Sequence, residues 1–332
     1  HSFLLSFQRE ITKSNVFEFN FIRKQAVHLL GGYNINQVNI RAGDSRCPGQ
    51  TFLDAFRLAQ TNTASCLIPL FRQTNGTQYT LAQFRTDFAA DLAGNSVANT
   101  ARVLAQRTGA SSLTSAGFSP FFFMPFPQFT GGFNVFDSSD YSNYTGLEFI
   151  FRRRITGGLG FQTAYTWSVS KDNRSFDPTQ TTVSAGTVQS ASSTPFDLRD
   201  RSLNYSYSDF DRRHVFQATW VWEFPFGDRR RFKSDSSVVN YIIGGWQLSG
   251  TLLWQSGRPF TVYSGFNTLT NTVGSTANCS SCPRNLGALV QEGGRNFWFD
   301  AAARAMFSNP AAGELGNTPR NHFLSAGYFQ PD

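Results

Sequence analysis

The sequence of 332 residues predicts an all-β fold: an antiparallel transmembrane β-barrel, of which the chain forms an incomplete segment of a large outer-membrane barrel. Three observations predict this fold. Six segments of about 9–13 residues alternate between apolar and polar residues, as strands with two different faces do. Short turns join these segments at one end, and long polar excursions join them at the other. No run of 18 apolar residues occurs, which argues against transmembrane helices.

The composition agrees with membrane-crossing strands. Charged residues make up 15% of the chain, against about 25% in an ordinary soluble domain. Aromatic residues also reach 15%, and 35 residues are Phe. The formal net charge is +7, but the arginines are scattered and the aromatic residues are segregated onto one face of each segment. We therefore expect dispersed, solvated arginines and no nucleic-acid partner.

Each alternating segment predicts one strand. Residues 214–224 show the pattern best: Phe216, Trp220 and Trp222 occupy even positions, whereas Gln217 and Glu223 occupy odd ones. At helical spacing the same residues form no apolar stripe. In chain order, the predicted strands are residues 3–10, 15–24, 143–153, 159–169, 214–224 and 246–257.

The alternation also assigns faces. Aromatic residues on one face predict a lipid-facing girdle: Tyr165, Trp167, Trp220, Trp222, Phe224, Trp246 and Trp254. The eight residues from Trp246 to Trp254 span about 20 Å of depth in a tilted strand, close to the height of the apolar band. Polar residues of opposite parity are candidates for the lumen: Gln162, Arg213, Gln217, Glu223, Gln247 and Gln255. Lining a polar interior is the ordinary role of such residues.

The connections predict which end faces the cell exterior. Short turns within residues 12–15 and 155–158 belong at the periplasmic end, and a moderate connection follows residue 224. Long extracellular loops are expected at about residues 31–142, 171–210 and 259–320. Within the first of these, the apolar spacing over residues 80–94 predicts a helix that stops at Gly94.

Four cysteines lie in polar, loop-like sequence, which is typical of an oxidising compartment. Cys279 and Cys282 form a C-x-x-C, which can be a redox dithiol or half of a zinc site. No second C-x-x-C and no thioredoxin-like pattern accompany it, so a local disulfide is favoured. Cys47 and Cys66 would then form the other disulfide.

Nothing in the sequence predicts an enzyme or a cofactor. Asp209, Asp211 and His214 could be read as a metal site or a general base, but no second ligand cluster accompanies them. We read them as ion-paired residues where a loop enters a strand. The glycine-rich stretches match neither a phosphate-binding loop nor a nucleophile elbow.

Several motifs taken together resemble one family. The stretches "SNYTGLEF", "AYTWSVSKD", "SDFDRRHVF", "WEFPFG" and "SGRPFTV" look like TonB-dependent outer-membrane receptors of the Oar-like type, which carry a carboxypeptidase regulatory-like domain. The resemblance is strongest over residues 125–265 and returns at 313–328. Residues 1–332 would then be the C-terminal part of the barrel domain, with the plug and the N-terminal domain outside this chain, which starts without Met or a signal peptide.

The resemblance implies active uptake of a scarce solute across the outer membrane of a Gram-negative cell. Implied partners are membrane lipid and lipopolysaccharide, the TonB complex reached through the missing N-terminal part, and an unknown extracellular ligand. The alternatives are a passive porin, an adhesin or structural barrel, and a soluble all-β binding module. Energy coupling would distinguish the receptor from the first two, and recovery in the outer-membrane fraction would exclude the third.

Overall fold

The computed structural model of the chain describes residues 1–175, 194–228 and 230–327. Its main feature is one long antiparallel sheet with strand order β1-β2-β3-β4-β6-β7, to which the short β5 adds beside β4. The six predicted strands correspond to the six long strands. Their bounds are β1 Ser2–Thr12, β2 Asn15–Asn34, β3 Asn134–Thr156, β4 Leu159–Asp172, β6 His214–Glu223 and β7 Gln247–Gln255, with β5 at Ser206–Tyr207.

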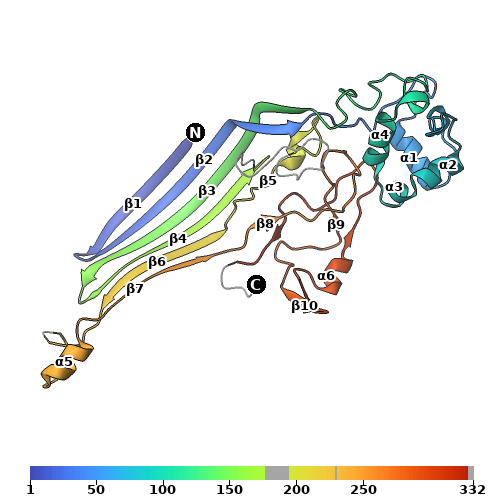
Figure 1. Cartoon of the computed structure of the whole chain (residues 1–332). Coiled ribbons are helices and arrows are strands. Elements are labelled where there is room, and N and C mark those ends of the chain that lie inside the picture. Colours follow the sequence, from blue (N-terminus) through green and yellow to red (C-terminus); the bar gives the residue numbers. More distant parts are fainter. Residues whose placement is uncertain (176–193, 229, 328–332) are drawn as a thin grey trace.

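The all-β prediction is confirmed, and the sheet is a partial barrel. In the described residues β1 and β7 are its two edges and do not pair with each other. Every pairing between neighbouring long strands is antiparallel. Figure 1 shows the strands running side by side as a curved, tilted band, with the long excursions gathered beyond one end.

The bounds of the first excursion differ from the prediction. β2 and β3 stay paired as far as Asn34 and Asn134, so the excursion covers residues 35–133 rather than 31–142. Register shifts at Ala26/Leu29 and Leu29/Gly31 interrupt the ladder, and His28 takes a positive φ of 58° there. These bulges break the strict alternation of apolar and polar residues. The alternation therefore ends near residue 24, whereas β2 continues to Asn34.

The turn end of the sheet is built on glycine. β3 and β4 meet at Gly157 and Gly158, with φ of 65° and 83°. A Cβ on Gly158 would lie 2.8 Å from the Glu223 carbonyl oxygen on the neighbouring strand. Positive φ and close backbone approach both favour glycine here. The connection from β6 to β7 is longer and contains α5, Ser237–Ile243, which lies at the same end of the molecule (Figure 1).

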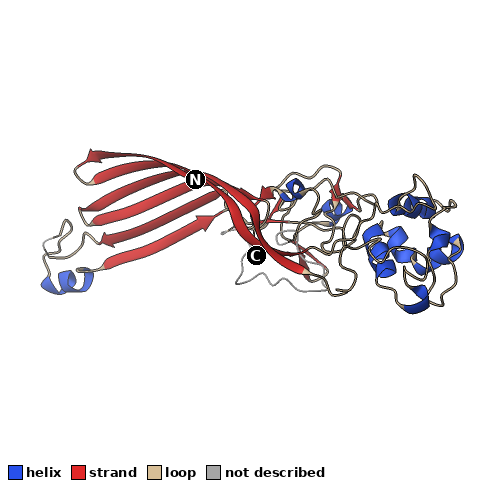
Figure 2. Ribbon diagram, turned by 90° about the horizontal axis from the view of Figure 1, so that it is seen from above, coloured by secondary structure: helices blue, strands red, loops and turns tan. Residues whose placement is uncertain are grey.

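Helices fill the first excursion. Figure 2 shows them grouped at the end of the molecule opposite α5. They are α1 Phe52–Gln60, α2 Leu81–Asp87, α3 Ala89–Ala93 and α4 Val97–Ala105, with 3-10 turns at Ile68–Leu70 and Gly109–Ser111. The single helix predicted over residues 80–94 is therefore two helices. Phe88 divides them because its φ of −113° and ψ of 27° leave helical geometry.

The remaining excursions contain short elements. The second excursion runs from residue 173 to 213. Residues 176–193, which belong to the long loop predicted here, lie outside the described residues. It contains a 3-10 turn at Arg201–Asn204. The third begins at residue 256 and contains α6, Ala301–Ala305. Its strand pairs are β8 Pro259–Phe260 with β13 Phe323–Leu324, β9 Asn278–Cys279 with β12 Phe307–Ser308, and β10 Val290–Glu292 with β11 Arg295–Phe297.

Candidate functional site

The sheet has one polar face whose residues the register aligns. Gln162 is paired with Arg152 on one side and Thr219 on the other, and Glu223 is paired with Gln247. Paired residues point to the same side of a sheet, and residues two apart do as well. The predicted lumen residues within strands therefore share one face: Gln162, Gln217, Glu223, Gln247 and Gln255.

Charged side chains on this polar face bond across strands. The Asn20 amide donates to Glu18 of the same strand at 2.9 Å and to Glu148 of the neighbouring β3 at 3.1 Å. Arg152 donates to Glu18 at 2.7 Å and to Gln162 at 3.3 Å. Hydrogen-bonded charges of this kind are incompatible with contact to hydrocarbon. The polar face is thus the side of the sheet that is unsuited to contact with hydrocarbon.

Arg213 departs from the predicted set. It lies one residue before β6, in the loop, and its guanidinium group sits 5.4 Å from the centroid of the Tyr207 ring. It forms an ion pair with Asp211 at 3.6 Å. Parity cannot assign a face to this residue, because the alternation only holds within the paired strand.

The opposite, aromatic face is exposed. Phe7 is 56% exposed and Trp222 is 40% exposed, and both lie on the face without charged networks. Rings from neighbouring strands contact each other, as Phe19 and Phe149 do at 5.2 Å between centroids. A contiguous exposed apolar surface of this extent fits an interaction with lipid.

The girdle residues fall into two levels. Tyr165 and Trp254 are both paired with Phe216, and Trp167 is paired with His214, so these aromatic residues lie together near the excursion end. Trp222 is paired with Leu159 and Leu248 near the turn end. Phe224 and Trp246 lie just outside β6 and β7, where the Phe224 amide donates to the Trp246 carbonyl at 2.9 Å. Trp220 lies between the two levels, with its indole over Gly250.

The three excursions form one folded body at the end of the sheet, which we call the loop cap: described residues 35–133, 173–175, 194–213 and 256–327. Its apolar core unites the helices with Leu269 and Ala312 of the third excursion. Gln37 joins all three excursions, since its amide donates to the Pro195 carbonyl at 2.7 Å and to Thr272 at 2.9 Å.

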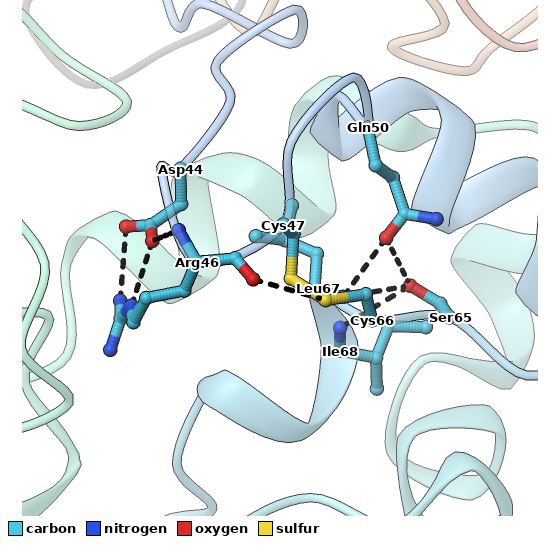
Figure 3. The surroundings of a disulfide bond; sticks show 8 residues. All are labelled: Asp44, Arg46, Cys47, Gln50, Ser65, Cys66, Leu67 and Ile68. Atoms are coloured by element: carbon cyan, nitrogen blue, oxygen red, sulfur yellow. Dashed lines mark hydrogen bonds and ion pairs between the residues drawn. A yellow bond between two sulfur atoms is a disulfide. The ribbon is translucent and has the colours of Figure 1, made fainter.

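A disulfide between Cys47 and Cys66 lies at the edge of this core (Figure 3). Beside it, Arg46 donates to Asp44 through two nitrogens at 2.7 and 3.0 Å. These hydrogen bonds hold the pKa of Asp44 below its usual value of 3.8. Gln50 accepts from the Leu67 amide at 2.9 Å, which fixes the segment that follows Cys66. Cys279 and Cys282 form the second disulfide.

The first helix of the cap starts with a capping box. The Asp54 amide donates to the Thr51 hydroxyl, and the Asp54 carboxylate accepts from the Thr51 amide at 3.0 Å. Hydrogen bonds from Thr51, first from its hydroxyl, hold the pKa of Asp54 below 3.8. The carboxylate also lies at the positive end of the helix dipole.

Buried ion pairs attach the cap to the ends of the strands. Arg174 pairs with Asp140 of β3 at 2.6 Å, and both side chains are almost fully buried. Arg320, which is fully buried, pairs with Asp172 at the end of β4. Breaking a buried pair leaves an uncompensated charge, so these contacts fix the cap to the wall.

A polar cavity of about 160 Å³ lies where the cap meets the sheet. Its lining includes residues from β2 and its continuation, from α4 and its C-terminal end, and from the third excursion: Asn34, Asn36, Arg102, Gln106, Asn267 and Asn271. These residues belong to none of the candidate sites predicted from the sequence. The asparagine-rich stretches "YNINQ" and "FNTLTNT" contain four of them and were the available signal.

The acidic residues considered as a metal site have structural partners. Asp211 accepts from the Ser170 amide at 2.7 Å, Asp209 from Asn321 at 2.6 Å, and His214 shares a hydrogen bond with the Tyr165 hydroxyl at 2.8 Å. Across the part of the chain that the structure describes, no group of three or more His, Cys, Asp or Glu residues could hold a metal ion. In the same residues no helix is long and apolar enough to cross a membrane.

Comparison with protein-family models gives a match over residues 1–332 to the family described as outer membrane beta barrel domain. No curated protein and no solved structure matches the chain.

Proposed function

The chain belongs to the outer membrane beta barrel domain family and is located in the outer membrane, and from this premise we propose that it is part of a TonB-dependent receptor. The aromatic face contacts lipid and lipopolysaccharide, and the polar face lines the lumen. The loop cap lies outside the cell and captures a scarce solute. The motifs that resemble Oar-like receptors support the TonB-dependent assignment.

The observation that carries this proposal is the cap itself. The first and third excursions share one apolar core, Gln37 joins the second excursion to both, and a disulfide and buried ion pairs fix the loops. Ordering loops costs conformational entropy, and binding is tighter when folding has already met that cost. A preorganised cap above a polar lumen suits capture of a dilute solute.

Planar-bilayer conductance and TonB binding test the proposal together. The intact protein, purified from outer membranes, should show no steady conductance in KCl, because a receptor lumen is plugged. It should also bind the purified periplasmic domain of TonB. Steady open-channel conductance without TonB binding would instead identify a passive porin. An adhesin or structural barrel would give neither conductance nor TonB binding.

A further inference from the structure

The cavity between the cap and the sheet contains one charged residue among the described residues that line it, Arg102 of α4. In the described part of the chain this guanidinium group forms no ion pair within 4.0 Å. A guanidinium group without a carboxylate partner at the wall of a polar cavity can pair with a carboxylate through two parallel hydrogen bonds.

Neighbouring amides orient the guanidinium group. Its Nη2 donates to Asn99 at 2.8 Å and its Nη1 to Gln106 at 2.9 Å. Asn99 is itself held by Asp91 at 2.9 Å, and Gln106 donates to the Thr130 carbonyl at 2.9 Å. These contacts use two of the five N–H groups, so the others remain available in a fixed orientation.

Further amide groups offer both donors and acceptors. Asn34 accepts two backbone amides through its oxygen, whereas its Nδ2 makes no hydrogen bond to any described residue. Asn267 donates to two carbonyls, which leaves its oxygen free to accept. The Asn34 side chain packs directly against the backbone of Gly132, where a Cβ would lie 2.3 Å from Asn34 Nδ2.

We propose that this cavity binds the carboxylate of a small polar solute, with Arg102 pairing with the carboxylate and the amides bonding to adjacent hydroxyl or amide groups. The cavity volume of about 160 Å³ falls below the ~300 Å³ of drug-sized pockets. The solute unit is therefore a single sugar-acid ring or a terminal peptide residue. The inference rests on the proposed function only in requiring that the cap meets external solutes.

Calorimetric titration of the intact, detergent-purified protein tests the site with four probes. Galacturonate and dialanine represent the two sources of a carboxylate, whereas glucose and the methyl ester of galacturonate lack the charge. We expect one or both carboxylates to bind, and both neutral probes to bind at least about tenfold more weakly, because a charge-assisted hydrogen bond is lost. Equal affinity for galacturonate and its ester, or no binding of any probe at millimolar concentration, would overturn the proposal.

Variants locate the binding. Arg102→Gln should weaken the preferred carboxylate about tenfold to a hundredfold, and Arg102→Lys should weaken it less, since the charge remains without the planar fork. Arg41→Gln removes an exposed arginine from the same cap and should change nothing. Equal losses in Arg102→Gln and Arg41→Gln would contradict the assignment.

The ester comparison uses unaltered protein, so it stands even where a variant misfolds. No titration involves TonB, so failure here leaves the transport proposal untouched.

Discussion

Trp222 and Glu223 are neighbours in sequence with opposite surroundings. Trp222 lies on the aromatic face and packs against Phe224 at 4.8 Å between ring centroids. Glu223 lies on the polar face and forms an ion pair with Arg230 at 3.0 Å. If the aromatic face contacts lipid, a charge has very different consequences at the two positions.

Arginine substitutions test this difference. Trp222→Arg should lower the free energy of unfolding in lipid vesicles by about 1–4 kcal/mol, depending on its depth. Glu223→Arg should lower it by about 1 kcal/mol or less, because an exposed ion pair contributes little. Urea titration followed by tryptophan fluorescence measures both. Equal losses for the two variants would show that the faces are misassigned.

Asp44 and Asp54 make the cap sensitive to acid. Hydrogen bonds lower the pKa of both carboxyl groups below 3.8 in the folded state. Folding therefore favours the ionised forms, and this stabilisation is complete above the unfolded pKa and disappears as the pH falls through the folded pKa. The cap should lose stability below about pH 4.

Melting temperatures between pH 7 and pH 3 check this expectation. Asp54→Asn should lower the stability of the cap by about 0.3–1 kcal/mol at pH 7, since the first helical turn loses its negative charge. The difference between this variant and the unaltered protein should shrink at pH 3. A constant difference across the range would rule out the carboxylate as its source.

Among the elements, the first excursion depends on its disulfide. Cys47 and Cys66 are 19 residues apart, and closing a loop of this length stabilises a fold by about 3 kcal/mol in the chain-entropy account. The Cys47→Ala, Cys66→Ala double variant should therefore unfold its cap at markedly lower urea concentration.

The second disulfide gives a matched control. Cys279 and Cys282 are three residues apart, so replacing both with alanine should cost less stability than removing the longer link. Hydrogen exchange of the cap amides reports each loss locally. A larger loss from the Cys279, Cys282 pair would contradict this account of how the cap is stabilised.

The elements also show how far sequence predicted the fold. Alternation located all six long strands, because one face of each is aromatic over the depth of the apolar band. It failed beyond that depth, where β2 continues to Asn34 through two register shifts and mixed pairs such as Leu29 with Asp140. In this part of the sheet neither face has to be apolar. The paired strands therefore show no alternation of apolar and polar residues by which the sequence could reveal them.

The helices of the cap were harder to predict for a different reason. α1 and α4 have nine residues each, and helices so short are stable mainly through tertiary packing. Their core includes Leu269 and Ala312, more than 150 residues away from α4 along the chain. The polar cavity is also lined by residues that are far apart along the chain. No local sequence motif could therefore predict that Arg102 belongs to a site.

At the scale of the whole molecule, the two ends of the sheet differ in kind. One end has the tight turns and α5, and the other has a folded, disulfide-bonded cap (Figures 1 and 2). Disulfides form and persist in oxidising environments, and long loops of outer-membrane barrels face the exterior. The central claim is that the sheet crosses the outer membrane with the cap outside the cell.

Labelling of single cysteines in intact cells tests that claim most directly. The native cysteines are paired in disulfides, so an introduced thiol is the reactive one. Thr74→Cys is exposed in the cap, and Lys13→Cys is exposed in the β1–β2 turn. A polymer-coupled maleimide too large for porins should label Thr74→Cys in intact cells and Lys13→Cys only after the outer membrane is permeabilised. The reverse pattern, or labelling of both in intact cells, would contradict the claim.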